Sequence, residues 1–349
     1  MKGIDKDMKN YKQLPKEKLG FFPTPVHRLD RLSAQLGINL YLKRDDFTGP
    51  NLFGGNKIRK LEYLLGDACQ KGADTVITFG ATQSNHAMET AVAANRLGLD
   101  TILYLETITP NDQQDDRANV LLDKILGARI HYVSMEGRTE AQADEISMQL
   151  ALAEKERLEA QGHHVYIIPV GGATPIGSVG FVLGFKELVE QLQNVDVDYV
   201  VHGSGTGGTA AGLIAGAKAF SKRSHKTQIL SINVSPKPES HYQKVVDLGN
   251  NALDLLGLED RISLADTHFD QSYFGEGYEI PSKAGSSAIR LLARTEGILI
   301  DPVYTGKAFA GLLDYVKNGK IKAGSNVVFW HTGGVSALFA EHKIVGKIE

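Results

Sequence analysis

The sequence predicts an α/β protein whose strands form two open, twisted, mostly parallel sheets flanked by helices. Short apolar runs alternate with longer helical patterns along most of the 349 residues, and this alternation is typical of βαβ units with right-handed crossovers. Several apolar runs are hydrophobic at nearly every position, as parallel strands covered on both faces require. The chain is also long for one compact core, which indicates about two domains.

The strands and helices can be placed along the chain from these patterns. Strands are expected at 38–44, 75–80, 101–106, 129–134, 165–170, 198–203, 228–234, 297–304 and 326–333. The clearest helices are expected at 57–72, 84–98 and 139–162. Residues 63–172 supply four strand–helix units, which are enough for a small sheet of their own. We therefore expect a small domain at 63–172 and a large domain formed by 1–62 together with 173–349.

Composition and charge exclude several classes of function. A net charge of −3 gives no basic field for nucleic acid or an anionic membrane. The single cysteine, Cys69, excludes intramolecular disulfides and a cysteine-based zinc cluster. It fits a reducing compartment, and we expect no metal site. The first residues are polar and charged, unlike a secretory signal, and no apolar run approaches the length of a membrane span. These features predict a soluble cytoplasmic protein.

Residues 200–220 hold a strand, a glycine-rich turn and a helix of small residues, a combination that can bind phosphate. Converging backbone N–H groups and the positive end of the helix favour an anion there. Gly203, Gly205 and Gly208 match the spacing G-x-G-x-x-G of dinucleotide-binding proteins, but no acidic residue for a ribose occurs before Glu239. The sequence therefore favours a phosphate cup without a nucleoside, while a purely structural tight turn stays open.

A second polar turn follows the strand expected at 75–80. Gln83, Ser84, Asn85 and His86 open the next helix in succession. One such residue is commonly just a helix cap, but four polar groups beside free N–H groups could bind a carboxylate.

Two further strand ends carry polar residues that could face a cavity. Tyr304 and Thr305 follow the apolar run near 300, and His331 with Thr332 ends the run near 330. A buried strand rarely ends in polar groups unless they face a cavity or cap a helix. Tyr278 lies in a loop that indicates little by itself.

Lys57 begins a predicted helix directly after Gly54, Gly55 and Asn56, where the positive helix end disfavours an ammonium group. Most lysines are simply exposed. Burial and nearby positive charge, however, lower the pKa of a lysine and make its neutral amine a nucleophile toward an aldehyde. Pyridoxal 5′-phosphate supplies both an aldehyde and a lone phosphate, so the lysine and the phosphate cup together suggest this cofactor.

Taken together, these motifs resemble the pyridoxal-phosphate enzymes of the tryptophan-synthase-β-like fold. More narrowly, the chain is similar to the group that contains 1-aminocyclopropane-1-carboxylate deaminase and D-cysteine desulfhydrase. The resemblance covers nearly the whole chain and rests on FPTPVHRLDRLS, YLKRDDFTGPNLFGGNKIRKLEYLL, FGATQSNHAM, HGSGTGGTAAGL, DPVYTGK and HTGG, in that order.

The resemblance implies a role for each matching residue. Lys57 is implied to be the Schiff-base lysine and to move protons at the substrate Cα. Asn85 is expected to hydrogen-bond the cofactor 3′-oxygen and Ser84 to hold the substrate carboxylate, while Tyr304 lies against the pyridine ring and Tyr278 reaches the substrate. The implied catalytic residues are Lys57, Ser84, Tyr278 and Tyr304. The implied cofactor contacts are Lys57, Asn85, Gly203, Ser204, Gly205, Thr206, Gly207, Gly208, Thr209, Tyr304 and Thr332. The implied substrate contacts are Gln83, Ser84, Asn85, His86, Tyr278 and Thr305.

Two positions bear on the activity that the resemblance implies. The cyclopropane deaminases carry glutamate and leucine where this sequence has Thr305 and Thr332, which is the desulfhydrase pattern. A threonine hydroxyl near the pyridine nitrogen leaves a weaker electron sink than a carboxylate, but one sufficient for β-elimination. The resemblance thus implies a homodimeric carbon–sulfur lyase that converts D-cysteine to pyruvate, hydrogen sulfide and ammonia. L-cysteate sulfo-lyase and the cyclopropane deaminase are the alternatives.

Two other classes of function compete with this interpretation. An NAD-dependent dehydrogenase would use the same glycine-rich turn. This sequence, however, lacks the acidic residue that binds the ribose of NAD, and a dehydrogenase would leave Lys57 unexplained. A non-catalytic amino-acid-binding protein could use the turn at Ser84 but has no need of the lysine.

Overall fold

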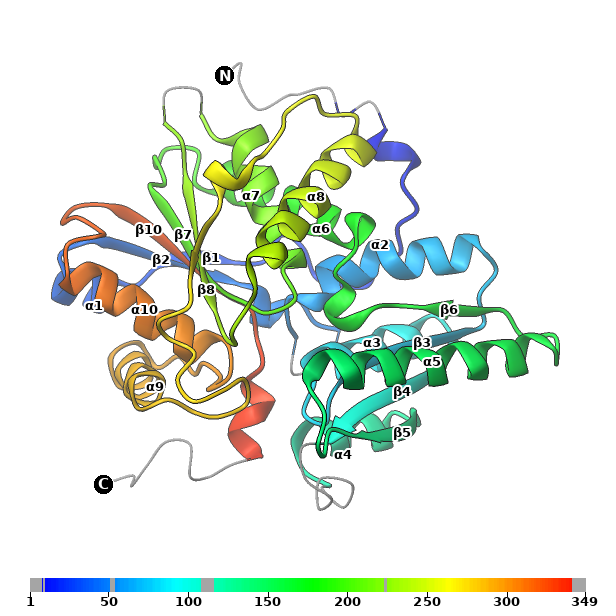
Figure 1. Ribbon diagram of the computed structural model, residues 1–349. Helices are drawn as coiled ribbons and strands as arrows, with labels where there is room; N and C mark the ends of the chain where they lie inside the picture. Colours follow the sequence, from blue (N-terminus) through cyan, green and yellow to red (C-terminus); the bar gives the residue numbers. More distant parts are fainter. Residues whose placement is uncertain (1–7, 9, 51–53, 108–115, 223–224, 341–349) are drawn as a thin grey trace.

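The strands of the protein form two separate sheets, which lie next to each other in the computed structural model (Figure 1). The structure describes residues 8, 10–50, 54–107, 116–222 and 225–340. The larger sheet has the order β1 (Val26–Arg28), β2 (Asn39–Arg44), β10 (Asn326–His331), β7 (Tyr199–Ser204), β8 (Gln228–Asn233) and β9 (His268–Asp270). The smaller sheet has the order β5 (Arg129–Ser134), β4 (Asp100–Thr107), β3 (Thr75–Ala81) and β6 (Val165–Ile167). All pairs are parallel except β1 with β2.

Helices cover both faces of the larger sheet. Alternation along β10 shows the two cores: Val328 and Trp330 belong to one apolar cluster, and Val327 and Phe329 to the other. Such burial on both sides explains why β10 is apolar at successive positions. The first cluster packs under α6 (Pro175–Gln191), α7 (Gly208–Phe220) and α8 (Glu239–Leu256), and the second under α1 (Asp30–Leu36), α9 (Lys283–Glu296) and α10 (Thr305–Lys317).

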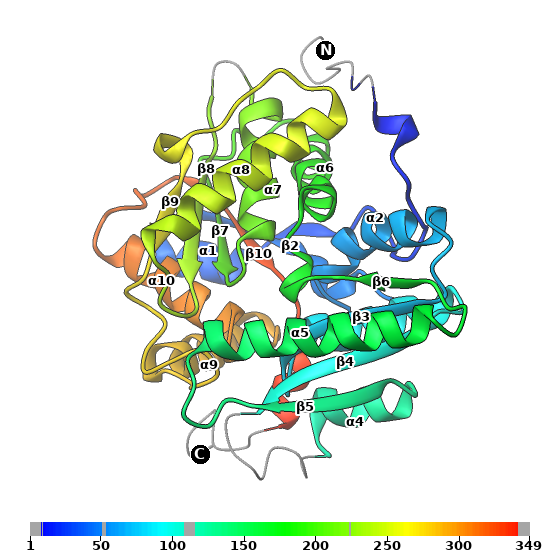
Figure 2. The same cartoon turned by 45° about the vertical axis from the view of Figure 1, so that its right-hand side comes forward.

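The smaller sheet is also covered on both faces. One apolar cluster joins Phe79 and Tyr104 to Ala151 and Leu158 of α5 (Glu140–Glu159), which lies across the front of the sheet in Figure 2. Other clusters pack the sheet against α2 (Lys57–Gln70) and α3 (Asn85–Arg96), and α4 (Ala118–Ile125) packs on α3. Short 3-10 helices complete the described elements: η1 (Tyr11–Gln13), η2 (Asp45–Phe47), η4 (Val170–Gly172), η5 (Leu264–Asp266) and η6 (Val335–Phe339). None of the helices in the described ranges combines the length and the apolar character that a membrane crossing requires.

The strands of the smaller sheet all come from 75–167, and those of the larger sheet come from the sequence on either side. The division into two domains at 62/63 and 172/173 stays a prediction. Helix α2 runs through the first of these boundaries and packs on α6 as well as on α3.

The prediction of a strand at 297–304 is wrong. Ile298 and Ile300 are buried against the larger sheet, but this segment is an irregular connection between α9 and α10. Its carbonyl at Leu299 accepts a hydrogen bond from Nε2 of His331 rather than from a neighbouring strand. The apolar run therefore reflects burial alone, which a sequence pattern does not separate from strand formation. Strands β1 and β9 have three residues each and were not predicted, because such short runs carry no period.

A buried ionic network fastens α2 to the larger sheet. The Asp45 carboxylate is fully buried and accepts hydrogen bonds from Arg59 Nε at 2.7 Å and from Trp330 Nε1 at 2.7 Å. Glu187 on α6 pairs with Arg59 at 2.9 Å and with Lys43 at 2.5 Å. The network thus fixes the helix two residues after Lys57 against the core of the larger sheet.

Candidate active site

A cavity of about 330 Å³ lies at the junction of the two sheets and collects most of the predicted site residues. Its walls come from the carboxyl ends of β3, β7 and β10 and from the starts of α2, α3 and α7, where ligands of open α/β sheets bind. The predicted residues that line it are Lys57, Ser84, Asn85, His86, Gly203, Ser204, Gly205, Thr206, Gly207, Thr209, Tyr278, Tyr304 and Thr332. Gln83, Gly208 and Thr305 are not among the lining residues.

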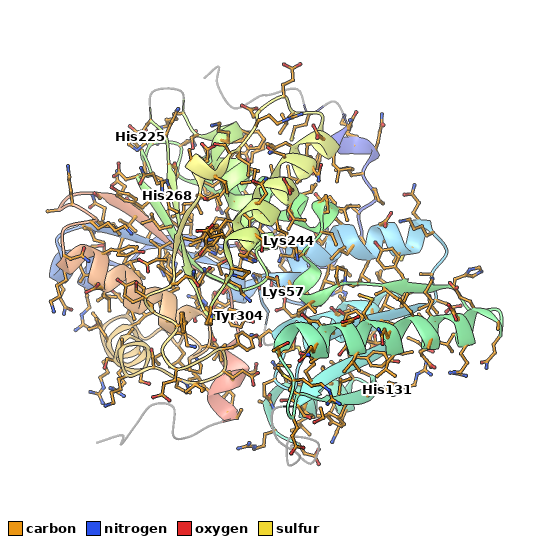
Figure 3. The ribbon with its side chains drawn as sticks, viewed as in Figure 1. Lys57, His131, His225, Lys244, His268 and Tyr304 are labelled. Atoms are coloured by element: carbon orange, nitrogen blue, oxygen red, sulfur yellow. The ribbon has the colours of Figure 1, made fainter. Side chains whose placement is uncertain are left out.

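Lys57 is the first residue of α2, and its side chain lies near Tyr304 at the junction of the sheets (Figure 3). The Nζ atom donates to Asn56 Oδ1 at 3.0 Å and lies 5.7 Å from the centre of the Tyr304 ring. Burial lowers the pKa of Lys57, against the opposing charges of Glu89 and Asp301. An amine of lowered pKa suits a nucleophile. The charges that act on it are negative, however, so burial and not a positive neighbour depresses its pKa.

The chain around Lys57 is held by close backbone contacts. Gly55 bridges to Gly333, and the Asn56 N–H donates to the Thr332 carbonyl at 3.0 Å. The Asn56 side chain also donates to Thr209 Oγ1 at 3.0 Å. A Cβ on Gly333 would lie 2.6 Å from the Gly54 carbonyl oxygen. Only glycine permits this approach, which brings the lysine next to the end of β10.

The turn between β7 and α7 has the properties of a phosphate cup. Gly207 adopts φ 90° directly before the first turn of α7, whose free N–H groups favour an anion. The Ser204 hydroxyl is buried at the cavity wall without a hydrogen-bond partner. A Cβ on Gly205 would lie 3.3 Å from the Tyr304 ring. An orphaned hydroxyl, free N–H groups and a glycine-lined wall fit the phosphate of pyridoxal phosphate beside an aromatic ring.

Lys60 also lines the cavity, and the sequence analysis missed it. It lies one turn after Lys57, is 1% exposed, and donates from Nζ to the Gly171 carbonyl at 3.0 Å. Its Nζ lies 3.1 Å from the position that a Cβ on Gly208 would occupy. Burial, and then the charge of Lys57, hold its pKa well below the usual value. The three-residue spacing of two lysines beside core leucines was the available signal, because residues three apart share a helix face.

Replacing Lys60 with methionine is expected to weaken cofactor binding. The Lys60 amine, which lies next to the start of α7, can donate to a phosphate oxygen. A hydrogen bond to a charged group contributes about 1.5–3 kcal/mol. The dissociation constant of pyridoxal phosphate, measured by titrating cofactor-free protein, should therefore rise roughly 10- to 100-fold. An unchanged constant in a folded K60M variant would count against this role.

The polar turn after β3 is arranged around the start of α3. Ser84 caps the helix by accepting from the Ala87 N–H at 3.2 Å, so part of its role is structural. His86 Nε2 lies 2.9 Å from the Thr78 hydroxyl, which itself donates to Ile168 O. His86 therefore donates from Nε2, and its buried Nδ1 has no partner. The carboxylate-binding role of the turn stays a prediction. The free Nδ1 of His86 does not support it, because an acceptor cannot hydrogen-bond to a carboxylate.

Gln83 and Asn85 differ in their positions, although they lie two residues apart. Gln83 accepts from the Asn119 N–H at 2.9 Å and so caps the start of α4 instead of facing the cavity. Asn85 lines the cavity, and its Oδ1 accepts from Asn119 Nδ2 at 2.9 Å. Because this bond engages the amide oxygen of Asn85, the amide N–H₂ is the group that can donate to a ligand oxygen.

Two tyrosines close the cavity on the side of the larger sheet. The hydroxyl groups of Tyr278 and Tyr304 are in hydrogen-bond contact, and their rings meet edge to face with centres 5.7 Å apart. Burial raises the pKa of Tyr278 well above its usual value. Lys307 holds the loop of Tyr278 by donating to the carbonyls of Gly277 at 2.7 Å and Tyr278 at 2.8 Å.

Thr332 and Thr305, predicted as a cofactor contact and a substrate contact, differ in their positions relative to the cavity. Thr332 lines the cavity. Thr305 is fully buried behind it, and its hydroxyl contacts Asp301 Oδ1 at 2.5 Å as part of the first turn of α10. Thr305 is the first residue of α10, and its hydroxyl is hydrogen-bonded to Asp301. The structure therefore does not bring it to the predicted substrate contact.

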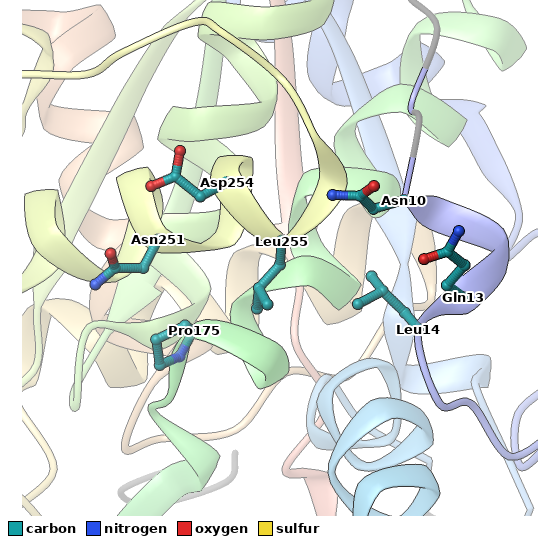
Figure 4. A pocket seen from close by; sticks show the side chains of 7 residues that line it. All are labelled: Asn10, Gln13, Leu14, Pro175, Asn251, Asp254 and Leu255. Carbon is teal, nitrogen blue, oxygen red and sulfur yellow. The ribbon is translucent and has the colours of Figure 1, made fainter.

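A second cavity, more open to solvent, has a different set of lining residues. It has a volume of about 640 Å³ and lies between η1 and α8 (Figure 4). None of the predicted site residues lines it. Within the described ranges, no cluster of three His, Cys, Asp or Glu side chains is placed to hold a metal ion.

A half-buried lysine and a phosphate cup that line one cavity, between two mostly parallel sheets, are typical of an enzyme with pyridoxal phosphate as its cofactor. A model of the family described as "Pyridoxal-phosphate dependent enzyme" matches residues 18–333. The chain belongs to this family and has its tryptophan-synthase-β-like fold.

Individual relatives agree with this family. D-Cysteine desulfhydrase of Klebsiella pneumoniae (strain 342) is 38% identical over 338 residues, which cover 96% of this chain and 98% of that protein. The enzyme of the same name from Salmonella typhi is 39% identical over 333 residues, 95% of this chain and 97% of that protein. A crystal structure of an "ACC deaminase homologue" is 38% identical, with a TM-score of 0.85 and 96% of each chain covered. O-Ureido-L-serine synthase, at 16% identity and a TM-score of 0.63 over 100% of this chain and 98% of that chain, shares the fold alone.

Proposed function

We propose that this enzyme is a carbon–sulfur lyase that converts D-cysteine and water to pyruvate, hydrogen sulfide and ammonia. The observation that carries the proposal is the half-buried Lys57 amine, which lines the same cavity as the cup at Ser204, in a chain whose relatives are D-cysteine desulfhydrases over nearly their whole length. Bound pyridoxal phosphate supplies the electron sink that stabilises negative charge at the substrate Cα.

The residues around the cavity would hold the substrate and move its protons. Lys57 Nζ would take the proton from Cα, because a depressed pKa favours the neutral amine that can act as a base. Ser84 and Asn85, at the start of α3, would bind the carboxylate through N–H donors. Tyr278, which meets Tyr304 at the cavity wall, would face the sulfur side of the substrate.

Substrate preference can be measured with a panel of four amino acids. We expect D-cysteine to release sulfide and keto acid with the highest kcat/KM, compared with L-cysteine, L-cysteate and 1-aminocyclopropane-1-carboxylate. Release of sulfite from L-cysteate at the highest rate would favour the sulfo-lyase. Keto acid from the cyclopropane substrate without sulfide chemistry would favour the deaminase, to which the name of the structural relative points.

The setting of the enzyme is also a proposal. The resemblance supports a homodimer, and a single cysteine, half-buried at Cys69, suits a reducing cytoplasm. Sedimentation equilibrium should give twice the mass of one chain, and a monomer at micromolar concentration would contradict the homodimer.

A further inference from the structure

Glu89 is a buried carboxylate beside the cavity, and the proposed reaction gives it no role. It is 2% exposed, lies on α3 one turn after His86, and is not among the residues that line the cavity. A carboxylate is rarely this buried unless another group pairs with it. The groups that contact the Glu89 carboxylate therefore indicate its role.

The carboxylate of Glu89 caps the helix that carries Lys57. Its Oε2 accepts from the Lys57 N–H at 3.0 Å and from the Ile58 N–H at 3.1 Å. The residue before the helix, Asn56, makes no side-chain capping bond of its own. The first N–H groups of α2 would otherwise be unsatisfied, and a negative group is favoured at that helix end.

The same carboxylate explains why glycine stands at position 55. A Cβ on Gly55 would lie 2.3 Å from Glu89 Oε1 and 2.8 Å from its Cδ. Any larger residue would push the carboxylate away from the two N–H groups. Glu89 and Gly55 thus fix the start of α2 together with the bonds that Asn56 makes to Thr209 and Thr332.

Glu89 is also coupled by charge to the amines in the cavity. Burial raises the pKa of Glu89 to about 7, against the charge of Lys57, its two backbone hydrogen bonds and the charge of Lys60. In return, the charge of Glu89 raises the pKa of Lys57, as does Asp301 ahead of α10. His86, on the same face of α3, has a pKa held well below its usual value by burial and is neutral.

We propose that Glu89 is a positioning residue for Lys57, which holds the turn that presents the amine and whose charge sets the pH range in which that nitrogen keeps its proton. The proposal rests on the function proposed for Lys57. It assigns no contact with substrate to Glu89.

The test compares three variants of the holoenzyme. E89Q keeps the shape and one acceptor but loses the charge, E89D restores the charge, and D123N replaces another buried carboxyl group, on α4, that lies outside the cavity. The pH dependence of the cofactor absorbance is measured for each, together with kcat and KM.

In E89Q the absorbance midpoint should fall by about one pH unit, because a nearby opposite charge shifts a pKa by 1–3 units. The value of kcat should fall more than KM rises, since Glu89 acts through Lys57. E89D should lie nearer to the native midpoint than E89Q, and D123N should match it.

A second measurement does not depend on the cofactor spectrum. The raised pKa of Glu89 means that its protonated form is favoured in the folded chain, so native stability contributed by this group is present below about pH 4.5 and lost as pH rises through about 7. The thermal midpoint of E89Q should therefore gain on that of the native protein between about pH 5 and 8.

An unchanged absorbance midpoint in folded, cofactor-loaded E89Q, or parallel stability profiles, would overturn the proposal for Glu89. Failure of the function proposed for Lys57 would look different, because the Lys57→Ala variant would then keep the native absorbance.

Discussion

The Lys57→Ala variant is expected to lose the cofactor absorbance near the visible edge and to lose lyase activity by roughly 10²–10⁴-fold or more, the range for removing a positioned general acid–base group. The Lys57 amine lies 5.7 Å from the centre of the Tyr304 ring, whereas the amine of Lys60, one turn later on α2, is engaged by the Gly171 carbonyl. Absorbance of the purified protein and single-turnover release of sulfide measure the two losses separately.

The matched control for this variant is Lys71→Ala. Lys71 directly follows the same helix, but its side chain is 62% exposed and pairs with Asp67 at the surface. It should keep native absorbance and rate. A native absorbance band in Lys57→Ala, whatever its activity, would show that another residue carries the cofactor.

Replacing Asp45 with alanine should lower the free energy of unfolding by about 3–5 kcal/mol, as expected when one partner of a buried ion pair is removed. The substitution leaves the Arg59 guanidinium buried with only Glu187 as its counter-charge, and it also removes the acceptor of Trp330 Nε1. Urea unfolding followed by tryptophan fluorescence reports this directly, because Trp330 lies in the network.

The effect of Asp45 should also depend on pH. Burial alone would raise its pKa, but the charge and hydrogen bonds of Arg59 hold the pKa of Asp45 below its usual value. Its contribution to stability is thus present above about pH 4 and lost as pH falls through the lowered pKa. The surface variant Lys71→Ala, which breaks the pair of this exposed lysine with Asp67, should change stability by less than about 1 kcal/mol. Equal losses in the two variants would contradict a central role of the network.

The order of strands and helices was largely predictable because most strands of this protein are buried on both faces and read as apolar runs. Eight of the expected runs contain strands of the structure. The failure at 297–304 shows the limit: Ile298 and Ile300 are apolar because they are buried, and burial does not require strand pairing. Strand β6 ends at Ile167, earlier than expected, just before Pro169, which cannot donate to a ladder.

The candidate site was predictable where glycines and polar residues stand at strand ends, and less so where contacts cross between elements. The cup at Gly203 and the lysine at position 57 follow from local sequence. Glu89 and Lys60 sit inside helices, and only tertiary packing brings them to the start of α2 and α7. Thr305 is not among the residues that line the cavity, and the sequence does not show that its hydroxyl hydrogen-bonds to Asp301.

The order of strands in the larger sheet has a consequence for how the protein is made. Strand β10 lies between β2 and β7, although it is the last of the described strands to leave the ribosome. The smaller sheet is continuous in sequence and can form during synthesis, as units of a nascent chain do. Strand β2 can pair with β10 only after nearly the whole chain has been synthesised. Thr332 and Gly333 directly follow that neighbour and hold the segment before Lys57. A nascent chain should therefore acquire its cofactor-binding competence last, and abruptly.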